Sequence, residues 1–262
     1  MNGVCAVMIG RKGSTGLPGK NTRLLNGKPM CWWPMNAAKA SNQVSRLIAC
    51  TDDPEIVRVV SDFQAEILER PDYLNTATAL GEDVFEYAYQ ELKRGYPQPE
   101  KTIFVLLMAN APTVSTALID QGIARLKEDT SADSAVTVSR YNMWSPTRAR
   151  RVSLDGTLIP FAPSLLVDAD SLANCDRDSQ GDVWFADMGV SVVRGRALAN
   201  IQSGQPPQRW MGRKTLPIFN DAGLDVDYEF QLPQAEWWLR QYKQRKDSAA
   251  FPQPSSGGLY PH

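Results

Sequence analysis

The feature that most limits the fold is a short apolar run near the amino end that leads directly into a basic, glycine-rich loop. Residues 4–9 are too few for a helix and rich in branched side chains, which favours a strand buried on both faces, as in a parallel sheet. Glycines then recur at every third position, which lets the backbone turn sharply and bring its N–H groups close to an anion. The loop holds Gly10, Arg11, Lys12, Gly13, Ser14, Gly16, Gly19, Lys20 and Asn21. This composition predicts a site for nucleotide phosphates, with a flexible surface turn as the alternative.

Two familiar phosphate-binding motifs do not fit this loop. The Walker motif has four residues between its first glycine and the Gly-Lys pair, whereas five residues separate Gly13 from Gly19 here. Asn21 also stands where that motif needs a hydroxyl. The dinucleotide fingerprint Gly-x-Gly-x-x-Gly fails because the glycine spacing here is three throughout. The loop is therefore neither a P-loop nor a dinucleotide-binding turn.

Strand-like apolar runs alternate with helical patterns over the first half of the chain. Further strands are expected at residues 46–50, 65–68, 102–108 and 134–139, with 102–108 as the central strand because it is the most hydrophobic. Helices are expected at residues 28–40, from Pro54, at 79–93 and at 116–127. Such alternation predicts an α/β fold with a mainly parallel, Rossmann-like sheet and helices on both faces. In such folds ligands bind beyond the carboxyl ends of the strands.

The alternation breaks after the fifth expected strand. Residues 140–188 hold scattered turns, several arginines and little helical periodicity, so we expect an inserted arm there. Strands are expected again at 189–193 and 215–219, followed by a final helix at 233–243 whose Trp237 and Trp238 pack on the sheet. The last residues are rich in Pro, Ser and Gly. We therefore expect one domain over residues 1–245, with the arm inserted at 140–188, and a disordered tail at 246–262.

Composition argues against several classes of function. The 262 residues have a formal net charge of -1, without the basic excess that nonspecific nucleic-acid binding needs. No run approaches the roughly 18 apolar residues of a membrane span and no secretory signal is recognisable, so we expect a cytoplasmic protein. The four cysteines form no C-x-x-C pair, which argues against a zinc site or a disulfide framework. Because His262 is the only histidine, we expect no histidine base.

Asp225 and Asp227 form a second candidate site near the carboxyl end. They lie two residues apart, so on extended backbone both carboxylates point to one face. Converging carboxylates repel one another unless a cation lies between them, and Mg²⁺ prefers such oxygen ligands. The alternative is a pair of solvated turn aspartates. We expect the glycine loop and this pair to meet around one triphosphate.

Four segments of the chain can be compared with known motifs. They are GRKGSTGLPGKN in the loop, TDD at 51–53, LERP at 68–71 and DVDYEFQLPQAE at 225–236. Together they resemble the CMP-sialic acid synthetase family, the cytidylyltransferases that activate nine-carbon 2-keto acid sugars, and their relatives. The resemblance spans roughly residues 4–240, and the first and last segments are specific in combination.

The resemblance implies that CTP and a small acidic sugar are the substrates, that Mg²⁺ is the cofactor and that the arm joins two subunits in a homodimer. The anomeric hydroxyl of the sugar acid would attack the α-phosphorus of CTP, and pyrophosphate would leave. Asp225 and Asp227 are the implied metal ligands. The implied catalytic residues are Arg11, Lys20, Asp225 and Asp227. The implied nucleotide contacts are Gly10, Arg11, Gly13, Ser14, Gly16, Lys20, Asn21, Arg70, Thr76 and Thr78.

The chain departs from the family mainly in the motifs for the sugar. Thr15 replaces a usual Lys, and LLMANAPTV at 106–114 replaces a run like LLQPTSPLR. Met108 therefore stands in the place of a sugar-contacting Gln and Val114 in the place of a cation. An Arg and an Asn also usually precede the glycine that is Gly189 here. These changes predict an altered acceptor, a sialic, legionaminic or pseudaminic acid-like sugar, or a loss of activity.

The candidate acceptor-binding residues are Met108, Asn110, Arg148, Arg177 and Gly189. The arginines of the arm either meet the carboxylate of the acceptor or are ordinary surface charge. Two other interpretations stay open. One is an enzyme of the same fold that uses another nucleotide or a neutral sugar, and the other is a nucleotide-binding protein that has lost turnover.

Overall fold

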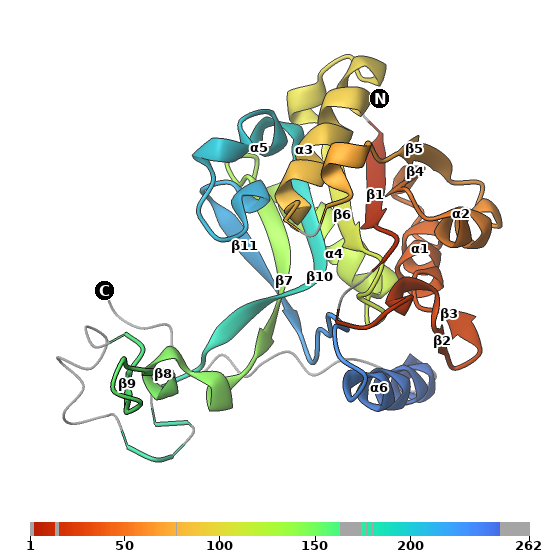
Figure 1. The fold of residues 1–262 in the computed structure, drawn as a ribbon. Coiled ribbons are helices and arrows are strands. Elements are labelled where there is room, and N and C mark those ends of the chain that lie inside the picture. The colour runs from red at the N-terminus through yellow and green to blue at the C-terminus, as the bar shows by residue number, and fades with distance from the viewer. Residues whose placement is uncertain are drawn as a thin grey trace.

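The computed structural model describes residues 3–13, 16–76, 78–162, 174–176, 178–179 and 181–246. Its centre is a seven-stranded sheet in the order β11-β7-β10-β6-β1-β4-β5 (Figure 1). β10 runs antiparallel to β6 and β7, and the other neighbouring strands are parallel. The mainly parallel α/β sheet expected from the sequence is thus confirmed. The strands are β1 (Val4–Gly10), β4 (Val44–Thr51), β5 (Glu66–Glu69), β6 (Ile103–Met108), β7 (Ser134–Arg140), β10 (Trp184–Arg194) and β11 (Thr215–Asn220).

Helices cover both faces of the sheet, because successive side chains of a buried strand point to opposite faces. On β1, Ala6 and Met8 belong to one hydrophobic cluster, whereas Val7 and Ile9 belong to another. The first cluster takes buried residues from α1, α2 and α4, and the second takes them from α3 and α5. β6 is the fourth of the seven strands, as expected for the most hydrophobic run. The helices are α1 (Trp32–Lys39), α2 (Pro54–Ser61), α3 (Gly81–Leu92), α4 (Thr116–Glu128), α5 (Gly195–Ala199) and α6 (Gln231–Lys246).

Capping residues fix where two helices begin. The side chain of Asp53 accepts a hydrogen bond from the Glu55 N–H at 2.9 Å, and proline occupies the first position of α2. Ser115 accepts a hydrogen bond from the Leu118 N–H at 3.3 Å at the start of α4. Both helices begin shortly after a parallel strand ends, so their amino ends lie near the edge of the sheet where ligands are expected.

The helix expected at residues 28–40 begins later than the sequence pattern indicated. Two short strands, β2 (Leu24–Leu25) and β3 (Lys28–Pro29), form a hairpin before α1. Asn26 and Gly27 turn this hairpin with φ of 49° and 78°, the left-handed backbone that an Asn-Gly pair favours. Pro34 lies in the first turn of α1, where its missing N–H costs no hydrogen bond. The Asn-Gly pair was the overlooked turn signal.

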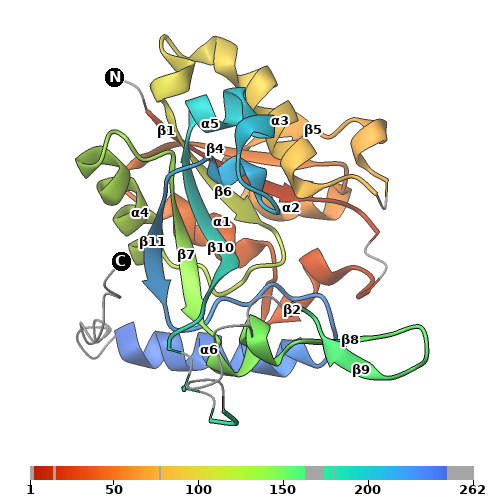
Figure 2. The ribbon, with the colours of Figure 1, turned by 90° about the vertical axis from the view of Figure 1, so that its left-hand side faces the viewer.

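Most of the described residues between β7 and β10, where the sequence predicted an arm, lie outside the central sheet. β8 (Arg150–Val152) and β9 (Leu158–Pro160) form an antiparallel hairpin that projects beyond the ends of β7 and β10 (Figures 1 and 2). β10 begins at Trp184, earlier than the strand expected from residue 189, and its pairing with β7 is irregular between Ala186 and Ser191. A role of the arm in dimerisation stays a prediction.

α6 lies across the end of the sheet toward which the parallel strands run (Figure 2). The expectation that both tryptophans of α6 pack on the sheet is wrong, because Trp237 is 57% exposed and Trp238 lies against a separate group of side chains. This third cluster joins the glycine loop, the β2–β3 hairpin and α6. It comprises Leu17, Leu25, Met30, Val226, Ala235 and Leu239, with Trp33, Leu224, Leu232 and Trp238 packed against it.

The remaining expectations about organisation are tested only in part. The described part of the chain shares one central sheet. α6 ends at Lys246, and the tail expected over 246–262 otherwise lies outside the described residues. None of the described helices is long and apolar enough to span a membrane.

Candidate active site

The glycine loop follows β1 and packs closely against its neighbours. A Cβ atom on Gly10 would lie 2.8 Å from both Ala109 Cβ and Ile56 Cδ1, so the end of β1 leaves no room for a side chain. Gly13 and Gly19 have φ of 72° and 66°, a conformation that glycine adopts without strain. These positions need glycine for steric reasons, whatever the loop binds.

Hydrogen bonds fix the backbone of the loop. The buried side chain of Asn21 donates from Nδ2 to the Arg11 carbonyl at 3.1 Å. The backbone N–H of Lys12 donates to Asp52 Oδ1 at 2.9 Å, and Arg11 Nη1 donates to the Gly13 carbonyl at 2.9 Å. Asn21 thus stabilises the backbone conformation of the loop through its buried side chain. Its contact with phosphate, and that of Arg11, stay predictions, and Ser14 lies outside the described residues.

Asp225 and Asp227 lie directly against this loop. Lys20 Nζ forms an ion pair with Asp227. A Cβ atom on Gly16 would lie 3.0 Å from the Asp227 carbonyl oxygen, so the loop backbone passes over the backbone of the acid pair. The two segments expected to surround one triphosphate are therefore neighbours in space.

Asn110, two residues beyond the end of β6, holds the acid pair from the other side. Its Nδ2 donates to the Asp225 carboxylate, to the Val226 carbonyl at 3.2 Å and to Asp227 Oδ1 at 3.4 Å. The Val226 N–H donates to the Asn110 carbonyl at 2.9 Å. Burial raises the pKa of Asp225 to about 6, and the neighbouring Asp227 adds to this rise, while Lys20 and Asn110 oppose it. The pair therefore attracts additional positive charge.

The donor set fits a hard divalent cation. The two carboxylates contact the ammonium group of Lys20 and the side-chain amide of Asn110. Positive charge is therefore stabilised next to these carboxylates. Among the described residues, no group of three or more His, Cys, Asp or Glu side chains could hold a metal. Mg²⁺ is usually bound by one or two carboxylates together with substrate phosphates, so Asp225 and Asp227 are sufficient protein ligands for it.

Polar side chains from neighbouring segments hold the backbone that leads into the acid pair. The Gly223 N–H donates to Ser139 Oγ at 2.9 Å, and the Tyr141 hydroxyl donates to the Gly223 carbonyl at 2.9 Å. The Leu224 N–H donates to Thr113 Oγ1 at 3.0 Å. The position of Asp225 is thus determined by β7 and by the loop between β6 and α4.

The buried carboxylate of Asp187 organises these groups. It accepts hydrogen bonds from the Thr137 and Ser139 hydroxyls, from the Gly189 N–H at 3.0 Å and from Asn220 Nδ2 at 3.0 Å. A Cβ atom on Gly223 would lie 2.1 Å from the Asp187 Cγ, so the acidic segment packs directly on this carboxylate. Sequence reasoning missed this Asp187 network. A signal existed, because the alternate polar residues of the strand SAVTVS need partners when buried.

Arg70 is buried rather than open to solvent. Its Nε donates to the Leu74 carbonyl at 2.9 Å, and the same carbonyl accepts from Nη2. Burial lowers the pKa of Arg70, and the positive charge of Arg11 contributes to the lowering, so the two cations lie in one neighbourhood. Arg70 therefore anchors the turn after β5, and its role in nucleotide binding stays a prediction.

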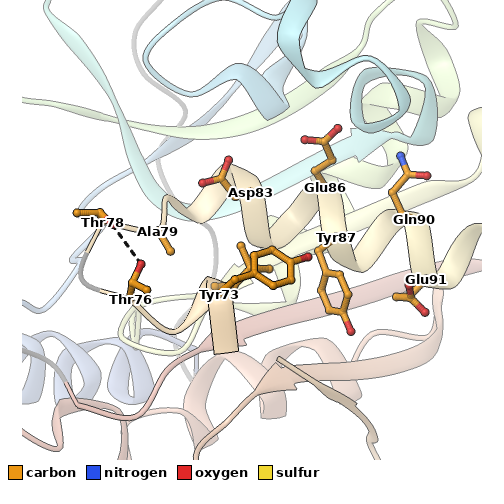
Figure 3. A pocket seen from close by; sticks show the side chains of 10 residues that line it. Tyr73, Thr76, Thr78, Ala79, Asp83, Glu86, Tyr87, Gln90 and Glu91 are labelled. Carbon is orange, nitrogen blue, oxygen red and sulfur yellow. Dashed lines mark hydrogen bonds between the residues drawn. The ribbon is translucent and has the colours of Figure 1, made fainter. Parts of the chain in front are cut away.

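Thr76 and Thr78 lie at one end of a pocket along the outer side of α3 (Figure 3). Their hydroxyl oxygens are 3.2 Å apart. The pocket has a volume of about 780 Å³, and α3 contributes Asp83, Glu86 and Glu91 to its lining. An acidic lining repels phosphate groups, so this pocket does not suit a triphosphate. The assignment of both threonines to the nucleotide remains a prediction.

The acceptor candidates are dispersed. Asn110 hydrogen-bonds to the acid pair, and half-buried Met108 packs between the two sheet clusters at the end of β6. Arg148 lies in the arm, where Nη2 donates to the Cys175 carbonyl at 2.7 Å. Gly189 lies in β10, where a Cβ atom would be 3.1 Å from Asp187 Oδ1. Arg177 lies outside the described residues.

Comparisons with known proteins indicate what kind of protein the chain is similar to. Residues 6–153 match a family model described as cytidylyltransferase. The chain is 29% identical over 208 residues to the 3-deoxy-manno-octulosonate cytidylyltransferase of Pseudomonas fluorescens, covering 76% of this chain and 78% of that protein. It is 22% identical over 237 residues to the N-acylneuraminate cytidylyltransferase of Oncorhynchus mykiss, covering 89% of this chain and 49% of that protein.

Two solved structures share the fold of this chain. One is CMP:2-keto-3-deoxy-manno-octonic acid synthetase complexed with CTP, with a TM-score of 0.65 and 17% identity over 92% of this chain and 99% of that chain. Another is 4-diphosphocytidyl-2C-methyl-D-erythritol synthase, with a TM-score of 0.64 and 12% identity over 91% of this chain and 99% of that chain. At these identities the likeness extends to the fold alone.

Proposed function

The chain belongs to the cytidylyltransferase family, and on that premise we propose that it transfers CMP from CTP to the anomeric hydroxyl of a 2-keto acid sugar. The hydroxyl oxygen forms a bond to the α-phosphorus, the bond from that phosphorus to the bridging oxygen breaks, and pyrophosphate and the hydroxyl proton leave. The observation that carries the proposal is the junction of Lys20, Asn110 and the acid pair beside the glycine loop.

The loop and its cations supply the phosphate site in this proposal. Backbone N–H groups of the loop and the side chains of Arg11 and Lys20 contact the triphosphate. Negative charge accumulates on the leaving pyrophosphate during the reaction, and preorganised cations stabilise it more in the transition state than in the bound substrate. No imidazole is needed for this chemistry.

Asp225 and Asp227 would hold Mg²⁺ in this enzyme, and the ion would neutralise phosphate charge. Asn110 keeps both carboxylates on one side of the site through its contacts with Asp225 and Asp227. Lys20, which pairs with Asp227 in this structure, would then interact with phosphate oxygens. The acid pair remains in place while its cationic partner changes.

The acceptor in this proposal is an acidic sugar of the nonulosonic or octulosonic acid class. The relatives named above act, by their names, on 3-deoxy-manno-octulosonate and on N-acylneuraminate, which are both 2-keto acid sugars. The residues that differ from the usual sugar motif, Met108 and Val114 among them, support an altered acceptor specificity within this class, for a sialic, legionaminic or pseudaminic acid-like sugar.

We also propose that the arm joins two copies of the chain. Its hairpin exposes several large apolar side chains, and such a concentration typically marks a protein interface. The exposed residues of this segment include Met143, Trp144, Val152, Leu154, Leu158 and Phe161.

The decisive test is pyrophosphate release from CTP and Mg²⁺ with a panel of nonulosonic and octulosonic acids. We expect release with at least one acid, and its loss in Asp227→Ala while the circular dichroism spectrum and melting temperature stay close to wild type. Parallel assays with UTP, GTP and dTTP should give little product. Binding of CTP without release for any acid would instead favour a protein that has lost turnover, and equal use of another nucleotide would contradict the assignment to CTP.

A further inference from the structure

A second cavity lies away from the acid pair, between α1, the start of α4 and α6. It has a volume of about 730 Å³. Trp32 and Trp33 of α1 and Trp238 of α6 contribute three indole rings to its walls. Figure 2 shows α6, which contributes Trp238, Leu239 and Arg240 to the cavity wall, lying across the end of the sheet toward which the parallel strands run. We call it the tryptophan cavity.

The polar groups of this cavity are mostly hydrogen-bond donors. Lys28 and Arg240 are both exposed, and neither forms an ion pair with a described residue. Lys28 Nζ lies 5.2 Å from the centre of the Trp32 ring. None of the 12 lining residues is acidic. The cavity therefore combines flat apolar walls with unneutralised positive charge.

A further observation indicates a missing acceptor. The amino end of α4 lies in the wall, where Ser115 satisfies the Leu118 N–H but leaves the first N–H groups of the helix without intrahelical partners. A ligand with negatively charged oxygen atoms would interact favourably with this end of the helix.

We propose that the tryptophan cavity binds a small aromatic anion, at a site distinct from the triphosphate site. The ring of the ligand packs against the indoles, and its acidic group faces Lys28, Arg240 and the amino end of α4. A neutral aromatic compound has no acidic group to face the cations, and inorganic phosphate has no ring to pack against the indoles.

The cavity shares residues with the third cluster, which reaches the candidate active site. Trp33 and Trp238 pack on the cluster that contains Leu17 of the glycine loop and Val226 of the acidic segment. A ligand that binds the folded protein alone stabilises it by mass action. Ligand binding should therefore raise the melting temperature.

The test uses naphthalene-1-sulfonate as the anionic probe and naphthalene-1-methanol as the neutral probe with the same ring, both measured by isothermal titration calorimetry. We expect the sulfonate to bind about tenfold or more tightly than the alcohol, because a charged group accepts stronger hydrogen bonds. Arg240→Gln should weaken sulfonate binding by about tenfold on the same grounds.

Two control variants locate the probe. Arg58→Gln removes an equally exposed arginine on α2, and Asp227→Asn alters the acid pair, and both should bind the sulfonate like wild type. Unchanged affinity in Arg240→Gln, equal binding of the neutral alcohol, or displacement of the sulfonate by CTP would each overturn the proposal. A change in oligomeric state in Arg240→Gln with unaltered probe binding would also overturn it, since the cavity would then be an interface between copies. Because the readout is binding of a non-substrate, these results do not depend on the proposed transferase activity.

Discussion

Lys20 and Asp227 form an ion pair although 207 positions separate them in the sequence. The Lys20 side chain is 15% exposed and that of Asp227 is 52% exposed, so the cation lies beneath the more open carboxylate. This pair connects the glycine loop to the acidic segment directly. It also places one positive charge at the point where the proposed reaction develops negative charge.

Lys20→Met should lower kcat/KM for CTP by about 100-fold, because loss of one preorganised group that stabilises transition-state charge typically has an effect of this size. Methionine keeps much of the aliphatic volume of lysine. The matched control is Lys12→Met, which removes another cation of the same loop that makes no ion pair among the described residues and should retain activity within about twofold. Similar losses in both variants, measured as pyrophosphate release, would contradict a specific role for Lys20.

The stability of the protein should fall as the pH rises through the pKa of Asp225. The folded-state pKa of about 6 lies above the ordinary value of 3.8 for an aspartate, so between these values the folded state binds more protons than the unfolded state. The free energy of unfolding contributed by this group therefore decreases from about pH 4 upward and levels off above pH 6 to 7. At 1.36 kcal/mol per pKa unit, the decrease is at most about 3 kcal/mol.

Asp225→Asn removes this titration while keeping a carbonyl oxygen that can accept the hydrogen bond from Asn110. Its stability relative to wild type should increase between pH 4 and pH 7, as measured by urea unfolding in the absence of divalent ions and nucleotide. Parallel curves for the two proteins over this range would rule out a raised pKa at Asp225. Its activity should be lost at every pH, because the carboxylate is a proposed metal ligand.

Local pattern was sufficient to predict the sheet and the neighbourhood of its site. Residues 4–9 and 102–108 are so hydrophobic that burial in a parallel sheet follows from their composition. Parallel strands end at one edge, so the loop after β1 and Asn110 after β6 necessarily approach one another. The acidic segment was expected there too, because two converging carboxylates suit a Mg²⁺ ion beside a bound triphosphate.

Side-chain networks and local turns were harder to predict. The hydrogen bond from Thr137 to Asp187 joins residues 50 positions apart, and it depends on β10 lying between β6 and β7, which no periodicity indicates. Asn110 was predicted to contact the sugar, which stays a prediction, and its hydrogen bond to the acid pair could not be read from the sequence. The Asn26-Gly27 turn is different, since its sequence signal was available.

The arm should control the oligomeric state. A double variant, Leu158→Asp and Phe161→Asp, places charges on side chains that are 70% and 63% exposed, and burying such charges in an interface is unfavourable. We expect a dimer for wild type and a monomer for the variant in analytical ultracentrifugation, with similar melting curves at low concentration. Leu24→Asp is the control, because Leu24 is 66% exposed outside the arm. A monomeric wild type, or a dimer in the double variant, would contradict the proposal.

Asp187 should stabilise both the fold and the position of the acid pair. Asp187→Ala leaves three buried donors and the half-buried Asn220 amide without their acceptor, and at about 1–3 kcal/mol for an unsatisfied buried group the free energy of unfolding should fall by about 3 kcal/mol or more. Asp187→Asn keeps one carbonyl acceptor in the same volume and should lose less. Asp62→Ala, a change at an exposed aspartate, should have an effect below about 0.5 kcal/mol.

Kinetic measurements distinguish a role of Asp187 in positioning the acid pair from a role in stability alone. Ser139 contacts both Asp187 and the Gly223 N–H, so a disturbed network moves the backbone that leads to Asp225. At a temperature where Asp187→Asn is fully folded, we therefore expect kcat to fall at saturating CTP and the Mg²⁺ concentration for half-maximal activity to rise. A variant that is less stable yet has wild-type kcat and Mg²⁺ dependence would show that Asp187 supports the fold without positioning the acid pair.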